Sequence, residues 1–333
     1  MKNSIILLFL YFTFSSILVQ AALSSDFKDQ SSFNEVWQVV QDTTQNSLID
    51  DSERSIKNSY SKNHFPTYEI NFSRFFSVTK SGIHDKLSAA TFRTLHDHRD
   101  YYPRIDKLLH SNGICFSGTW NITHSTEYSG LFANNTAIPL IARASTTLSG
   151  VRRGEKRGAA LALKLFPTTT NDTATLTQNI FAIDMLAGRH IRHFTDVSMT
   201  NEPDFGLSLN LPLGLHVLKS FLKADQNPGF RPIDHLAQFD AQGRQEFLVR
   251  SPKWIKFEPH YSNKTSDHAD FREELFESAS DQPLRYDILV KSAKADFNDK
   301  KSWQRVGYIL LSQPTISYGC DRQLHFPHPR INP

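Results

Sequence analysis

The chain has 333 residues, of which 39% are hydrophobic and 21% are charged, and its formal net charge is +3. This is the composition of a globular protein with ample material for a core, and it excludes a collagen-like, a wholly disordered or a polytopic membrane protein. The net charge is too small on a chain of this length to predict nucleic-acid binding. The 25 phenylalanines favour a sheet-rich interior.

The first 22 residues have the pattern of a secretory signal. Met1-Lys2-Asn3 precedes an apolar run from Ile5 to Leu18, and Ala21 and Ala22 then offer small residues for cleavage. The run is shorter than the roughly 20 apolar residues that span a bilayer. We therefore expect a secreted or periplasmic protein with no transmembrane segment after the signal is removed; an uncleaved anchor is the alternative.

The two cysteines, Cys115 and Cys320, are too few for a disulfide scaffold. Export would permit one bridge between them. Two small buried thiols are the interpretation that we favour.

Residues 23–66 are predicted to form an N-terminal helical arm. Phe33, Val36, Val39 and Val40 recur with helical spacing in a polar surrounding. An arm of this kind could be exchanged between subunits, so the sequence is compatible with a homo-oligomer.

Residues 67–333 contain no linker and are predicted to form one domain. Strands are expected at 114–122, 139–145, 159–166, 179–186, 284–291 and 306–311, and helices at 213–223 and 269–278. Strands near one another in sequence, then helices, then more strands predict an α+β fold with a largely antiparallel sheet or barrel.

The residues contain none of the common local catalytic signatures. There is no G-x-S-x-G, no H-E-x-x-H, no P-loop and no dinucleotide-binding fingerprint. Motif chemistry alone therefore assigns no enzyme class.

Several segments, taken in order, resemble haem catalases. Residues 109–120, which contain His110 and a glycine-containing aromatic strand, are similar to the distal segment of that family. Residues 141–146 resemble its Val-Arg-Phe-Ser-Thr strand, and 156–166 its Arg-Gly-Phe-Ala-Val-Lys-Phe strand. Residues 178–184 and 321–326 follow in the same order. Phrases such as Ser317-Tyr318-Gly319-Cys320-Asp321-Arg322 look most like the short catalase-like proteins, and the similarity covers roughly residues 70 to 330.

The resemblance implies a catalase-like antiparallel barrel with flanking helices and a haem cofactor. His110 stands at the position of the distal acid/base, a role that suits an imidazole. Ser145 matches the serine that orients this histidine, and Arg143 matches an arginine that pairs a haem propionate. Asn179 stands near the family's distal asparagine, which would hydrogen-bond the peroxide; a slip of two residues would put Thr177 there.

The chain departs from catalases at the proximal side of the haem. The family ligates iron with a tyrosinate in an Arg-x-x-x-Tyr helix, and no such motif occurs in this sequence. Tyr318, which lies near Arg322, could substitute, and His325 or His328 could also bind iron. Arg104 lies near the position of a second family arginine. The metal ligand is therefore left open.

Two functions follow from the resemblance. The first is an exported haem protein that acts on hydrogen peroxide or organic hydroperoxides, with the segments around His110 and Arg143 facing each other across an interior hollow. The alternative is a non-catalytic binding module that has lost the proximal ligand and holds an apolar ligand or nothing. An exported domain with no small-molecule site is a third interpretation.

Overall fold

The computed structural model describes residues 30–41, 110, 112–124, 126–146, 156–167, 171–172, 175–184, 189–202, 251–260, 268–292, 302–324 and 326. The secretory signal, Arg104, the helix predicted at 213–223, His325 and His328 lie outside the described residues. No helix in the described part of the chain is long and apolar enough to cross a membrane.

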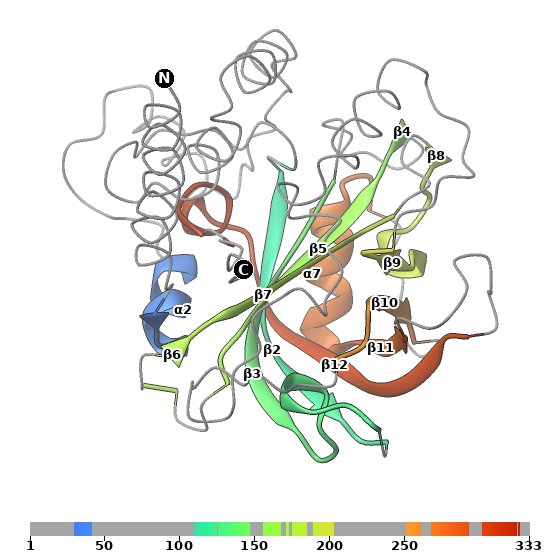
Figure 1. Ribbon diagram of the computed structural model, residues 1–333. Coiled ribbons are helices and arrows are strands. Elements are labelled where there is room, and N and C mark those ends of the chain that lie inside the picture. Colours follow the sequence, from blue (N-terminus) through green and yellow to red (C-terminus); the bar gives the residue numbers. More distant parts are fainter. Residues whose placement is uncertain are drawn as a thin grey trace, which may run out of the picture.

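Eight antiparallel strands close into a barrel (Figure 1). In the order in which they pair around the barrel, they are β10 (Trp254–Pro259), β11 (Leu284–Lys291), β12 (Gln304–Thr315), β2 (Gly113–Ile122), β3 (Ala137–Thr146), β5 (Ala159–Leu165), β7 (Gln178–Ile183) and β9 (Met199–Thr200). The predicted α+β class with an antiparallel barrel is confirmed. The sequence had not indicated β9 or β10, and β9 is too short for alternation to reveal it.

The remaining described elements flank the barrel. They are the helices α2 (Phe33–Gln41) and α7 (Phe271–Asp281), the 3₁₀ turns η1 (Gly130–Phe132) and η2 (Phe194–Asp196), the π-helical turn η6 (Gly319–Gln323), and two small ladders, β1 (Gln30–Ser31) with β6 (Thr175–Leu176) and β4 (Lys156–Arg157) with β8 (Arg189–His190).

Side chains from one face of each of the eight strands fill the interior of the barrel. Phe116, Trp120 and Phe257 are fully buried there in a single apolar cluster. The Trp120 ring forms T-shaped pairs with Phe132 and Phe257, at centroid separations of 5.4 and 6.3 Å. Its indole N–H donates to the Leu131 carbonyl at 2.8 Å. The described barrel interior is therefore a packed core.

Helix α7 contributes to the same core. Asp270 caps its N-terminus by accepting from the Arg272 backbone N–H at 2.8 Å, and its carboxylate also pairs with the Arg272 guanidinium at 2.7 Å. Phe271 and Leu275 point into the core, where the Phe271 ring stacks on the Phe194 ring at a centroid separation of 5.3 Å. The acidic helix predicted at 269–278 is confirmed.

The buried phenol of Tyr286 makes stability sensitive to alkali. Burial raises the pKa of Tyr286 far above its ordinary value near 10, and the charges of Glu274 and Asp196 add to the rise. The folded state keeps the proton while the unfolded chain loses it above about pH 10, so the free energy of unfolding falls as pH rises through that value.

Replacing Tyr286 with phenylalanine should remove this contribution. The free energy of unfolding is measured in urea at about pH 9 and at about pH 11. Between these two pH values, it should fall by about 1.4 kcal/mol less in Tyr286→Phe than in the wild type. If the free energy of unfolding falls equally with pH in the two proteins, the alkaline loss of stability does not come from Tyr286.

Helix α2 packs on the outside of the barrel. Ser32 and Glu35 form a reciprocal cap, in which the Glu35 N–H donates to Ser32 Oγ at 3.2 Å and the Ser32 N–H to Glu35 Oε2 at 3.4 Å. Val36 and Val40 are buried in a second apolar cluster with Phe166. The helical spacing read from the sequence is confirmed for this part of the arm; the domain boundaries remain predictions.

Candidate functional site

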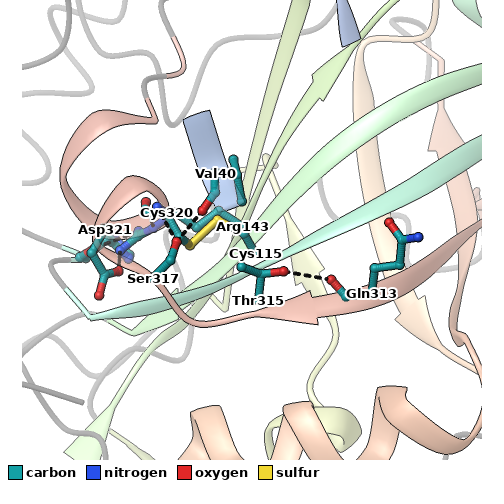
Figure 2. The surroundings of a disulfide bond; sticks show 9 residues. Val40, Cys115, Arg143, Gln313, Thr315, Ser317, Cys320 and Asp321 are labelled. Atoms are coloured by element: carbon teal, nitrogen blue, oxygen red, sulfur yellow. Dashed lines mark hydrogen bonds and ion pairs between the residues drawn. A yellow bond between two sulfur atoms is a disulfide. The ribbon is translucent and has the colours of Figure 1, made fainter. Parts of the chain in front are cut away.

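A disulfide bond joins the barrel to the C-terminal turn. Cys115 on β2 and Cys320 on η6 are 205 residues apart in sequence, yet their Cα atoms are 5.8 Å apart and both side chains are fully buried (Figure 2). The favoured interpretation of two free thiols is therefore wrong. A separation of this length carried no signal of the pairing, because only the packing of η6 against β2 brings the two sulfur atoms together.

Turn η6 is also held against the end of α2 (Figure 2). The Ser317 hydroxyl donates to the Val40 carbonyl and accepts from the Cys320 backbone N–H at 3.0 Å. A Cβ added at Gly319 would lie 1.8 Å from the Val39 carbonyl oxygen, so only glycine permits this approach. Together with the disulfide, these contacts fix the turn on both α2 and β2.

Arg143 lies at the centre of this junction. Its Nη2 forms an ion pair with Asp321 Oδ1 at 2.7 Å, its Nε donates to the Cys320 carbonyl at 3.2 Å, and its Nη1 donates to the His110 carbonyl at 2.8 Å. The side chains of Arg143 and Asp321 are only 4% and 0% exposed. A Cβ at Gly113 would lie 2.5 Å from the guanidinium, so the glycine supplies the space that Arg143 occupies.

His110 is fixed at its backbone and at its ring. Its φ of 58° lies in the left-handed region, which is uncommon for any residue other than glycine. Its ring Nδ1 lies 3.2 Å from the Ser145 hydroxyl, and the tautomer decides which of the two donates. The His110 and Phe181 rings form a T-shaped pair, with a centroid separation of 5.4 Å and an interplanar angle of 84°.

The strand register gathers the predicted residues on one surface, which we call the outer face. Cys115, Arg143, Ala162 and Phe181 are successive cross-strand partners on β2, β3, β5 and β7, and they point away from the interior core. Ser145, two residues beyond Arg143 on β3, shares this face because side chains alternate along a strand.

Asn179 lies on the outer face as well. It is two residues before Phe181 on β7, so one pleat repeat of about 7 Å separates them. Thr177, the alternative position, is on the same face and accepts from the buried Lys164 ammonium at 3.3 Å. On β5, between these polar groups, the small residue Ala162 lies opposite Arg143 and Phe181.

The structure therefore brings His110, Ser145 and Arg143 into direct contact and puts Asn179 on the same face two strands away. Tyr318 is buried directly before η6. The sequence pointed to every one of these positions but missed Asp321. Asp321 lies in the segment 317–322 that resembles the short catalase-like proteins, but nothing local indicated a partner 178 residues away.

Comparisons with known proteins leave the family unassigned. No family model matches the chain, and no curated protein matches it. The solved structures that are similar to it include two catalases. A bacterial catalase is 14% identical over 83% of this chain and 60% of its own, and a fungal catalase is 11% identical over 83% and 56%; both have a TM-score of 0.35. The chain spans less than two thirds of the length of either.

The described residues do not fit a haem bound in the way that the sequence resemblance implies. That arrangement needs Arg143 for a propionate, but here the guanidinium is committed to Asp321 and to two backbone carbonyls. One feature of the implied arrangement is present: the Ser145 hydroxyl orients the His110 imidazole, which packs against the Phe181 ring.

Proposed function

We propose that the protein is an exported, non-catalytic binding module built on a catalase-type barrel, and that its outer face around His110 holds a small apolar ligand with at most one hydrogen-bonding group. The observation that carries this proposal is the ion pair of Arg143 with Asp321, since the carboxylate neutralises the guanidinium beside His110, which would otherwise select an anionic group.

The surroundings of His110 support an apolar ligand. Ala160 and Ala162 are small residues on the outer face, and Phe181 presents an aromatic ring beside them. Ligand sites combine such apolar surfaces with a few oriented polar groups, and the Ser145–His110 pair is one of these. The secretory pattern and the buried disulfide support passage into an oxidising compartment.

A second candidate is a haem-dependent oxidoreductase acting on hydroperoxides, with His110 as acid/base, Ser145 as its orienting residue and Asn179 as a hydrogen-bond donor. The hydrogen bond between His110 and Ser145 favours it, because a fixed imidazole is what proton transfer needs. This candidate requires residues other than Arg143 to hold the haem.

One set of measurements separates the two candidates. We expect the purified protein to show no Soret band and to gain none on titration with haemin. We expect it instead to bind the neutral apolar dye Nile red saturably. Ala162→Phe fills the outer face and should weaken dye binding about tenfold, whereas Ala137→Phe, at the exposed start of β3, should leave it unchanged.

A Soret band in the purified protein would overturn the binding-module proposal in favour of the second candidate. In that case His110→Ala should slow peroxide consumption at least about a hundredfold while the absorption band remains. A protein that neither gains a Soret band nor binds the dye would contradict both candidates.

A further inference from the structure

We infer that Asp321 is a positioning residue for His110, acting through Arg143, and that the Cys115–Cys320 disulfide keeps Asp321 in place. The inference deepens the proposed function, since it rests on His110 being the polar group that meets the ligand. It also assigns Arg143 a role different from the propionate clamp that the sequence resemblance implied.

The first step is the rigidity of the guanidinium. Asp321 Oδ1 holds Nη2 at 2.7 Å, and Nη1 of the same planar group donates to the His110 carbonyl at 2.8 Å. Because the donors of an arginine lie in one fixed fork, a shift of the carboxylate rotates the donor that holds His110. The Arg143 and Asp321 side chains are both buried, so solvent water cannot readily replace either hydrogen bond.

The second step is the backbone of His110. A histidine in the left-handed region persists only where its surroundings hold it there. The Arg143 hydrogen bond fixes the carbonyl, and therefore the peptide plane, that follows His110. The position of the imidazole against Ser145 and Phe181 depends on this plane, since the side chain starts from the same Cα.

The third step is the anchorage of Asp321 itself. The residue before it, Cys320, supplies both the sulfur bonded to Cys115 and the carbonyl that accepts from Arg143 Nε at 3.2 Å. The disulfide therefore fixes the acceptors on Cys320 and Asp321 together, because they belong to neighbouring residues. The His110 carbonyl, which also accepts from this guanidinium, belongs to the residue that is being positioned.

The test is the ¹⁵N NMR spectrum of the His110 imidazole in the unliganded protein, assigned with His110→Gln. We expect one set of ring signals in the wild type. Asp321→Asn and Arg143→Lys should each shift or split these signals. Arg143→Lys keeps the charge but loses the fork, so a change in this variant identifies geometry rather than charge as the cause.

Asp270→Asn is the matched control. It removes the charge from another Arg–Asp pair, the partly buried contact with Arg272 at 2.7 Å, and it should leave the His110 signals unchanged. Should Asp321→Asn fail to fold, Asp321→Glu, which keeps the charge but displaces the carboxylate, takes its place. His110 signals that stay at their wild-type positions in folded Asp321 and Arg143 variants would overturn the inference.

The outcome is independent of the proposed function, because no ligand is present in the NMR experiment. A shifted His110 signal together with absent dye binding would reject the binding module and retain the positioning role. Conversely, about tenfold weaker Nile red binding in Asp321→Asn, with the His110 signals unchanged, would reject the positioning role and retain the ligand site.

Discussion

Replacing Cys115 and Cys320 together with alanine is expected to lower the free energy of unfolding by about 4 to 5 kcal/mol. The bridge closes a loop between residues 205 positions apart. In the chain-entropy account, a loop of this length strongly restricts the unfolded chain, so its loss makes unfolding easier. The site loses an anchor as well, because η6 carries both Cys320 and Asp321.

Urea unfolding with and without dithiothreitol measures the effect. The wild type should unfold at a lower urea concentration when reductant is present throughout, whereas the double alanine variant should be insensitive to it. A thiol assay on the denatured, unreduced wild type should detect no free thiol. Two titratable thiols per chain would show that the bridge does not form and would restore the interpretation that the sequence favoured.

Asp321→Asn is expected to cost about 3 to 5 kcal/mol of folding stability. The substitution keeps the shape of the side chain but removes the counter-charge from a guanidinium that is 4% exposed. A buried cation without its partner is far more costly than the pair is favourable, because desolvation of the charge is no longer offset. Chemical denaturation at neutral pH measures the loss.

Two comparisons sharpen this second prediction. Asp270→Asn removes the charge from a carboxylate that is 20% exposed, so solvent screens the loss and the cost should be about 1 kcal/mol. Replacing the pair with apolar residues, as Arg143→Met with Asp321→Leu, should recover most of the stability lost by Asp321→Asn alone. Equal costs for the two aspartate variants would mean that Asp321 is not held as described.

The two large effects should not be additive. The disulfide and the ion pair restrain the same turn, and residues that share a restraint couple in double-mutant measurements. In a protein that lacks the bridge, η6 can move away and let water reach Arg143, so Asp321→Asn should cost less there than in the wild type. The difference between the two costs of Asp321→Asn, with and without the disulfide, measures how strongly the bridge holds the carboxylate in place.

Local patterns predicted the strands of an antiparallel sheet or barrel, and the resemblance to catalases implied its closure into a barrel. Alternation along 284–291 and the apolar strands at 114–122, 139–145 and 159–166 reappear as β11, β2, β3 and β5. Pleated strands place alternate side chains on opposite faces, and that periodicity is readable without knowing the partner strand. Strand β9 was not predicted, since its two residues are too few to carry a pattern; β10 was not predicted either.

The sequence predicted which residues belong to the candidate site, but not where on the barrel they lie. His110, Ser145, Arg143 and Asn179 were named from ordered segments that resemble catalases. Strand register places Ser145, Arg143 and Asn179 on one face, and hydrogen bonds join His110 to Arg143 and Ser145 there. Their relation to the barrel was not predictable. The interior is filled by rings such as Phe116 and Trp120, so the predicted residues meet outside it.

The sequence by itself determined the α+β class, the positions of most strands and the helical face of α2, because each depends on the spacing of residues close together in the chain. Tertiary structure alone decided that Cys115 pairs with Cys320 and that Arg143 pairs with Asp321. Both contacts join residues more than 170 positions apart. They form only when the packing of η6 on α2 and β2 brings the partners within bonding distance, and no periodic pattern records that event.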